Sequence, residues 1–375
     1  MIIAVNTKRK GKDESEENDN FIFEAFSRIA RLQPLHTFIL IFETVPRDSI
    51  IFPDNIVTAA IGPQTKNPAQ WYIWYNIKIP AVLKKYKANV FVNYGGIGSL
   101  TTKIPQCLIV PNLSFVYFPA LFQKSQLLFY KTFTPRSLKK SKVVITLSEF
   151  CKAEIIKKYK INAAKIEVVY CGVNENIRQI TADEREDIKE KYAGGNEYFI
   201  YAGEIGSHQN LLNLLKAFSA FKKRQKSNMQ LLIAGKPAGK QEEFAENLRL
   251  FKFKEEVKIL QNLSPGEITN VTSAAYAMVY PTVFEGSATH PLKSMKCGVP
   301  VITSSTSAMP EICADAALYA DPGNFKDIAV KMMALFKDEK LRKELIEKGK
   351  IQAEKYSWDN TAGQLWKCIE KTVHK

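Results

Sequence analysis

The sequence has no aspartate or glutamate between residues 55 and 148, although this stretch contains twelve lysines and arginines. The whole chain of 375 residues carries a formal net charge of +15. A long basic stretch without carboxylates is typical of surfaces that bind polyanions, either nucleic acid or anionic lipid headgroups, and a solvated basic face is the alternative. No zinc finger, RNA-recognition signature or basic zipper is present, so the sequence does not predict a nucleic-acid partner.

Within this basic stretch, residues 124–142 alternate apolar and cationic side chains. The apolar ones are Leu127, Leu128, Phe129, Tyr130 and Phe133, and six lysines or arginines lie among them. This mixture is more typical of a segment at a membrane interface than of one that reads bases. We therefore expect contact with an anionic membrane surface through residues 55–148.

The sequence also lacks paired cysteines and long apolar runs. Its six cysteines are scattered without a CxxC pair, which predicts reduced core thiols of a cytosolic protein and neither a metal site nor a disulfide. No apolar run approaches the roughly 20 residues that a membrane-spanning helix needs. The apolar residues 1–6 precede the first cations, opposite to a signal peptide, and predict a buried strand. The charge-dense residues 8–20 that follow predict a solvated loop. We expect a cytoplasmic protein with a peripheral contact to the inner face of the membrane.

Short β-branched apolar runs alternate with helical stretches along the chain, and the alternation occurs twice. This pattern predicts an α/β protein with two doubly wound parallel-sheet domains in tandem. A polar stretch at residues 174–197 separates the two halves. We expect an N-terminal domain at 1–180, a second domain at 181–356 and a closing helix at 357–375. Such sheets bind ligands at the carboxyl ends of their strands, and the crevice between two of them is the predicted pocket.

Two loops of the second half directly follow predicted strands. In residues 202–212, Gly203 would allow the backbone to approach a ligand, although a plain strand-to-helix turn is equally compatible with the pattern. In residues 283–300, Ser287 or Thr289 is a candidate N-cap of a short helix that Gly298 is expected to end, and the backbone amides at its start would face an anion. Glu285 is a candidate for hydrogen bonds to sugar hydroxyls, and a loop acid that satisfies local amides is the alternative.

Nucleophilic and dinucleotide chemistry have little support in the sequence. Neither a GxSxG elbow nor an HExxH helix accompanies the four histidines. Residues 94–100, YGGIGSL, lack the GxGxxG spacing, so no dinucleotide cofactor is predicted. We interpret this segment, with Gly96, as a tight turn that lines the cleft.

Taken together, SEFCKAEIIKKY, KIEVVYCGVNE, YFIYAGEIGSHQNLLNLLKAFSAF, PTVFEGSATHPLKSMKCGVPVITSSTSAMPEICADAALYADPGN and YSWDNTAGQLW resemble the family 4 glycosyltransferases. The resemblance covers most of the chain. It implies the GT-B architecture, in which two Rossmann-like domains face each other across a cleft and the last helix returns to the first domain. It also implies a nucleotide-sugar donor on the second domain, a glycan or lipid-linked acceptor on the first, transfer with retained anomeric configuration, and neither a metal nor another cofactor.

The resemblance assigns roles to individual residues. Glu285, where the family's acid–seven residues–acid motif begins, is the candidate catalytic residue. The predicted donor-binding residues are Gly203, Glu204, Gln209, Gly286, Ser287, Ala288, Thr289, His290 and Lys293. The predicted acceptor-side residues are Gly96, Pro111, Asn112 and Ser148. Apart from the resemblance, Ser148 is the expected N-cap of a helix over SEFCKAEIIKKYK.

Several of these positions depart from the family pattern. Lys293 stands where the family has a second acid that holds the donor ribose. Glu204 and Gln209 stand where it places an arginine and a lysine on the diphosphate, and Pro111 and Asn112 replace a histidine-aspartate pair. The leading hypothesis is therefore a glycosyltransferase with an altered donor site. The alternatives are a catalytically degenerate homologue that acts as a binding or scaffold partner, and a basic carbohydrate- or membrane-surface protein without donor use.

Overall fold

A computed structural model describes residues 1–7, 16–44, 51–206, 209–237 and 242–374 of the chain. The chain divides into two compact units, and each contains one parallel sheet. Unit 1 comprises Met1–Gly172 and Trp358–Lys375, and unit 2 comprises Val173–Ser357. The predicted α/β class with two doubly wound sheets is confirmed.

The sheet of unit 1 has seven strands in the order β3-β2-β1-β4-β5-β6-β7, and all of its neighbouring pairs are parallel. The strands are β1 (Ile2–Asn6), β2 (Thr37–Phe42), β3 (Ile56–Ala60), β4 (Val90–Tyr94), β5 (Gln106–Val110), β6 (Val143–Thr146) and β7 (Ile166–Val168). The central strands are buried on both faces, which explains why their sequences are continuous apolar runs.

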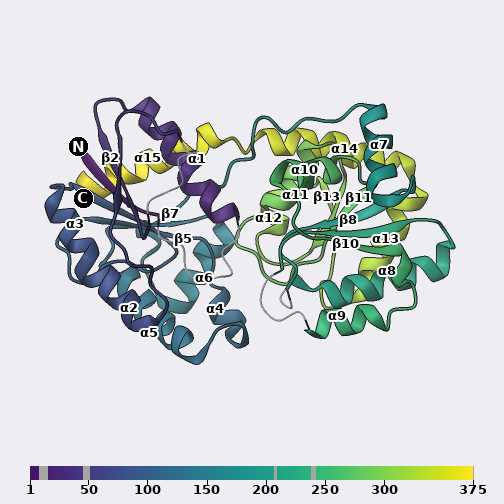
Figure 1. Ribbon diagram of the computed structural model, residues 1–375, viewed down its shortest axis with the longest axis horizontal. Helices are drawn as coiled ribbons and strands as arrows, with labels where there is room; N and C mark the ends of the chain where they lie inside the picture. Colours follow the sequence, from purple (N-terminus) through teal and green to yellow (C-terminus); the bar gives the residue numbers. More distant parts are fainter. Residues whose placement is uncertain (8–15, 45–50, 207–208, 238–241, 375) are drawn as a thin grey trace. The chain divides into compact units, whose positions relative to one another are not determined.

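Helices cover both faces of this sheet (Figure 1). They are α1 (Glu16–Leu32), α2 (Pro68–Ile73), the π-helix η1 (Trp74–Lys78), α3 (Ile79–Lys85), α4 (Ser114–Tyr117), the 3₁₀ turns η2 (Pro119–Leu121) and η3 (Ala163–Lys165), α5 (Lys124–Lys140), α6 (Glu149–Tyr159) and α15 (Trp358–His374). The charged segment at residues 8–20 was expected to be a loop, but α1 already begins at Glu16.

The C-terminal helix α15 belongs to the core of unit 1. Trp358, Leu365 and Ile369 are buried in the same hydrophobic cluster as strands β1, β4, β5 and β6. Figure 1 shows α15, in yellow, beside the purple helix α1. The hydroxyl of Thr361 donates to the carbonyl of Tyr170 at 2.7 Å. Residues far apart in the sequence thus complete one core.

The division between the units falls at Gly172 and Val173, ahead of the boundary expected near residue 180. The amide of Val173 donates to the carbonyl of Tyr356 at 2.9 Å, and Val173 forms a parallel bridge with Ser357. Because of these bonds, the start of the polar stretch is already part of unit 2.

The sheet of unit 2 has six parallel strands in the order β10-β9-β8-β11-β12-β13. The strands are β8 (Tyr198–Ala202), β9 (Gln230–Ala234), β10 (Val257–Leu260), β11 (Ala277–Tyr280), β12 (Val301–Ser304) and β13 (Ala317–Ala320). The helices are α7 (Ala182–Ala193), α8 (Leu211–Gln225), α9 (Glu242–Arg249), α10 (Pro265–Ser273), α11 (Thr289–Lys296), α12 (Met309–Cys313), α13 (Phe325–Lys337) and α14 (Glu339–Glu354), with a 3₁₀ turn η5 (Lys254–Glu256).

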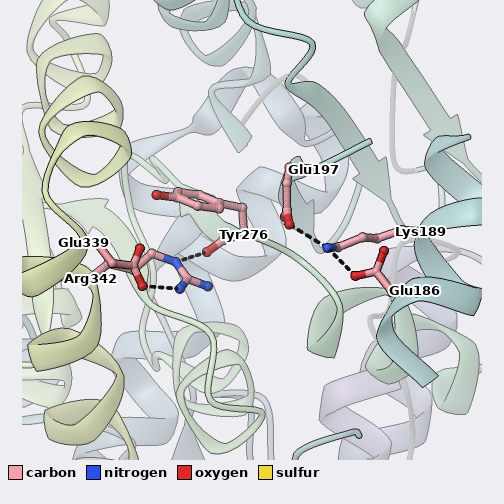
Figure 2. A network of polar contacts seen from close by, with 6 residues as sticks. All are labelled: Glu186, Lys189, Glu197, Tyr276, Glu339 and Arg342. Carbon is pink, nitrogen blue, oxygen red and sulfur yellow. Dashed lines mark hydrogen bonds and ion pairs between the residues drawn. The ribbon is translucent and has the colours of Figure 1, made fainter. Parts of the chain in front are cut away.

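Two groups of polar contacts connect helices α7 and α14 of unit 2 to the residues just before strands β8 and β11 (Figure 2). Lys189 of α7 is nearly buried and pairs with Glu186 at 2.9 Å and with Glu197, just before β8, at 2.5 Å. Burial alone would lower the pKa of Lys189, but its hydrogen bonds to Glu197 and Glu186 outweigh that effect and raise the pKa. In the second group, the Arg342 guanidinium of α14 lies 4.6 Å from the ring centre of Tyr276.

Candidate functional site

The two candidate donor loops follow neighbouring strands of unit 2. Strands β8 and β11 pair directly, with Ala277 opposite Phe199. Gly203 therefore leaves the sheet beside the segment that carries Glu285, at the carboxyl edge where doubly wound sheets bind ligands. The topology places both candidate loops at one edge of the sheet of unit 2.

Two buried tyrosines connect these loops, and the sequence analysis missed both. The rings of Tyr201 and Tyr280 stack with centroids 5.4 Å apart and planes 9° apart. The hydroxyl of Tyr201 donates to the carbonyl of Glu204 at 2.8 Å, and that of Tyr280 donates to Oε2 of Glu285 at 3.3 Å. A tyrosine near the end of each strand, in YFIYA and AMVY, was the available signal. Each hydroxyl thus anchors one candidate loop.

The backbone around Glu285 is also fixed by the segment that follows β12. The amide of Ala308 donates to the carbonyl of Glu285 at 3.3 Å, and the hydroxyl of Thr306 donates to the carbonyl of Val283 at 3.3 Å. Within the sheet, the hydroxyl of Thr303 in β12 donates to the carbonyl of Tyr280 in β11 at 2.9 Å. Glu285 is therefore held both at its backbone carbonyl and at its side-chain carboxylate.

The predicted N-cap of α11 is wrong. The capping position is Ala288, with φ −116° and ψ 43°, and no side chain caps the helix there. The hydroxyls of Ser287 and Thr289 instead lie 3.1 Å apart and bond to each other. The predicted helix end is confirmed, because Gly298 follows the last turn with φ +74°. A helix start without a side-chain cap leaves its amide dipoles for an anionic ligand.

His290 and Lys293 lie on one face of α11, because residues three apart in a helix are neighbours. The ring of His290 lies 5.4 Å from that of Tyr280, which also bonds Glu285. Both His290 and Lys293 are half-buried. The structure therefore brings Glu285, Tyr280 and His290 together, with Lys293 one turn further along.

The loop between β8 and α8 is tied to the same edge. Asn210 has a left-handed backbone, with φ +62°. Its side-chain amide donates to the carbonyls of Pro281 at 2.7 Å and Pro322 at 2.8 Å. Gln209 is 6% exposed, and within the described part of the chain its Oε1 has no hydrogen-bond partner. Residues 207 and 208, which include a histidine of the predicted loop, lie outside the described residues.

The candidate acceptor-side residues follow three neighbouring strands of unit 1. Gly96 comes after β4, Pro111 and Asn112 after β5, and Ser148 after β6. The thiol of Cys151 lies 3.6 Å from the carbonyl of Pro111 and connects the last two of these segments.

Ser148 and Asn112 serve their own segments. The hydroxyl of Ser148 accepts the amide of Cys151 at 3.2 Å, which confirms the predicted cap of α6. The side chain of Asn112 accepts the amide of Ser114 at 3.0 Å. Ser148 is fully buried, so its side chain stabilises the start of α6 and is not exposed at the edge of the sheet. Across the residues that the structure describes, no cluster of three or more His, Cys, Asp or Glu is arranged to hold a metal ion.

Two family models match this chain and together cover most of it. Residues 30–176 match Glycosyltransferase Family 4, and residues 183–352 match Glycosyl transferases group 1. The chain belongs to the family 4 glycosyltransferases. The two matched ranges fall almost entirely within unit 1 and unit 2, respectively.

Curated relatives of this glycosyltransferase include two bacterial proteins. O-antigen chain mannosyltransferase B of Escherichia coli is 24% identical over 68% of this chain and 67% of its own length. O-antigen chain mannosyltransferase RfbU of Salmonella typhimurium is 26% identical over 74% of each.

Among solved structures, WaaG, a glycosyltransferase involved in lipopolysaccharide biosynthesis, matches with a TM-score of 0.77 and 14% identity over 98% of this chain and 99% of its own. Anabaena HepE in complex with UDP-glucose matches with a TM-score of 0.76 and 12% identity over 99% of each chain. At these identities the structural likeness establishes the fold of the glycosyltransferase alone.

Proposed function

We propose that this glycosyltransferase transfers a mannosyl residue from a nucleotide-sugar to a growing glycan or a lipid-linked acceptor. The observation that carries the proposal is the anchored carboxylate of Glu285, held by Tyr280 beside a helix start without a side-chain cap. The two bacterial relatives described above are named O-antigen chain mannosyltransferases, and this supports mannose and a polysaccharide acceptor.

In the proposed reaction, the bond between the anomeric carbon and the donor phosphate breaks, and a bond from the same carbon to an acceptor hydroxyl oxygen forms. The proton of that hydroxyl passes to the departing phosphate oxygen. Glu285 would accept hydrogen bonds from the sugar hydroxyls. The amides at the start of α11, together with Lys293, would stabilise the charge that develops on the leaving diphosphate. Transfer with retained configuration then needs leaving-group stabilisation and neither a dedicated base nor a metal.

The altered residues set an expectation for affinity. Each charge-assisted contact to a diphosphate is worth about 1.5–3 kcal/mol, and Glu204 and Gln209 supply no cation. Lys293 can bond a phosphate but cannot accept hydrogen bonds from ribose hydroxyls. We therefore expect donor binding that is weaker than the family pattern would give, with a larger share of the affinity from the sugar and from the backbone amides.

A calorimetric screen of UDP-, GDP- and ADP-sugars, with and without EDTA, tests this function. We expect one mannose donor to bind, to transfer to a mannose-terminated alkyl glycoside, and to give the same rate with EDTA. If none of these donors binds at millimolar concentration, the proposal is wrong. The degenerate alternative is not favoured by the relatives. The degenerate alternative would be supported if the triple substitution Lys293→Glu, Glu204→Arg and Gln209→Lys created donor binding that the wild type lacks.

We also propose that the basic part of unit 1 contacts an anionic membrane at its cytoplasmic face. Ile77 of η1 and Leu128 of α5 are 58% and 68% exposed, and the four lysines of α5 are exposed as well. Two of the five apolar residues expected at this surface are instead buried, because Phe129 and Tyr130 pack against Trp71. No helix in the described ranges is long and apolar enough to span a membrane, so the proposed contact is peripheral.

Flotation with vesicles of phosphatidylcholine and phosphatidylglycerol measures this contact. We expect binding that rises with the anionic lipid fraction and falls with salt. The double substitution Ile77→Glu and Leu128→Glu should abolish most of it. The control is Ile351→Glu in α14 of unit 2, where a 62%-exposed isoleucine lies outside this surface. Equal binding by neutral and anionic vesicles would contradict the proposal.

A further inference from the structure

Strand β3 is an edge strand of the sheet of unit 1, and among the described residues it pairs with β2 alone. The amide of Ile61, directly after β3, donates to the carbonyl of Phe42 at 3.0 Å. Backbone groups point alternately to the two sides along a strand, so every second residue counted back from Ile61 faces β2. The amides and carbonyls of Thr58 and Ala60 therefore point away from the sheet.

Strand β3 lacks the charged side chains that usually protect an edge strand from pairing with another chain. Three of its five residues are exposed, and residues 55–65 contain no Asp, Glu, Lys or Arg. The edge strands β7 and β10 instead carry Glu167 and Lys258, and every residue of the edge strand β13 is buried or half-buried. In the described part of the chain, β3 is therefore the least protected of the four sheet edges.

Large apolar side chains are exposed near the start of β3. Ile51 and Leu35 are each 91% exposed. Leu35 lies in the turn before β2, and the side-chain amide of Asn55 donates to the carbonyls of Gln33 at 3.2 Å and His36 at 3.0 Å, on either side of it. Because Asn55 directly precedes β3, these bonds fix the turn beside the start of the strand. Covering the edge would therefore also remove apolar surface from water.

We propose that two copies of the chain pair their β3 strands in antiparallel fashion, across a twofold axis at Thr58. In this register Thr58 lies opposite Thr58 of the second copy, and the two residues exchange both of their outward hydrogen bonds. Val57 then lies opposite Ala59 of the second copy, and Ile56 lies opposite its Ala60, so each larger side chain meets an alanine. Strand β3 is thus complementary to itself in backbone and in side-chain size, as a twofold interface requires.

The charges at the two ends of β3 are opposite in sign. Asp54 is exposed just before the strand, and just after it the ammonium of Lys78 donates to the carbonyl of Ile61 at 3.0 Å. Glu43, a carboxylate at the same end as Lys78, already accepts the amide of Thr65 at 3.0 Å. Antiparallel pairing brings Asp54 of each copy toward Lys78 of the other. This complementarity favours a second copy as the partner, although the net charge of +15 opposes association elsewhere.

Sedimentation velocity of the full chain, without donor or acceptor, tests this proposal. We expect a monomer of 42.4 kDa and a species of twice that mass, with a dissociation constant of about 10 µM. Thr58→Pro should raise this constant about 20-fold or more, because it removes an outward N–H and yet breaks no bond to β2. Thr58→Val is the matched control. It keeps the N–H and the branched side chain, so its dissociation constant should stay within about threefold of the wild type.

Two further measurements keep the outcome decisive. If Thr58→Pro does not fold, Ala60→Lys adds a cation at an exposed position of the edge and should raise the dissociation constant about tenfold. Val330→Lys, at a 48%-exposed position of α13 in unit 2, is its control and should leave the constant unchanged. Hydrogen exchange at the amides of Thr58 and Ala60 should slow about tenfold between about 1 and 200 µM protein.

Two results would overturn the proposal. The first is a wild type that remains at 42.4 kDa at about 200 µM, well above the expected dissociation constant. The second is a dimer that persists unchanged in the folded edge variants, which would place the contact on another face. Because no measurement uses a sugar, these results are independent of the proposed transferase function.

Discussion

Glu285→Gln is expected to lower kcat/KM for the nucleotide-sugar by about 10²-fold, close to 3 kcal/mol of transition-state stabilisation. The amide has the same shape but loses the negative charge that strengthens its bonds to sugar hydroxyls. The hydroxyl of Tyr280, now 3.3 Å from the carboxylate, can still donate to the amide oxygen. The fold should therefore be preserved, and steady-state kinetics with a thermal unfolding curve distinguish lost chemistry from lost structure.

Two matched variants show whether the effect belongs to Glu285. Tyr280→Phe keeps the ring stacked on Tyr201 and removes only the hydroxyl, so kcat/KM should fall about three- to tenfold through poorer positioning. Glu347→Gln neutralises an exposed carboxylate of α14 and should leave the kinetics unchanged. If Glu285→Gln keeps kcat/KM within twofold of the wild type, the carboxylate has no part in transfer.

The parts of the fold that the sequence predicted depend on short-range chemistry. Alternating apolar runs predict the strands because each parallel strand is buried on both faces. Ser148 predicts the start of α6, and Gly298 predicts the end of α11, because each acts within one helical turn. The order of these local signals was enough to identify two doubly wound sheets.

The parts that the sequence did not predict depend on which strands become neighbours. Asn6 and Asn93 meet only because β1 pairs with β4, and Tyr201 stacks on Tyr280 only because β8 pairs with β11. The prediction of an N-cap for α11 was wrong for a different reason. Ser287 and Thr289 bond to each other, and this competition between two short hydroxyl side chains cannot be resolved from residue types.

The carboxyl edge of unit 2 also depends on a contact between two glycines. The amide of Gly203 donates to the carbonyl of Ala234, and the amide of Gly235 donates to that of Leu260, each at 3.0 Å. The backbones of β8, β9 and β10 are thus fixed where they leave the sheet. A Cβ on Gly235 would overlap the carbonyl oxygen of Gly203 and lie 2.8 Å from its carbonyl carbon. Both atoms are backbone, so no side chain can move aside.

Gly235→Ala is therefore expected to lower the free energy of unfolding of unit 2 by about 3–5 kcal/mol. All four tryptophans lie in unit 1, so tryptophan fluorescence in a urea titration follows unit 1, whereas circular dichroism follows both units. The circular-dichroism transition should move to lower urea while the fluorescence transition stays in place. Gly363→Ala is the control, since a Cβ there meets nothing within 4 Å inside α15, and it should stabilise unit 1 by about 0.5–1 kcal/mol. A Gly235→Ala protein whose circular-dichroism midpoint matches the wild type would show that the two loops can separate without loss of the sheet edge.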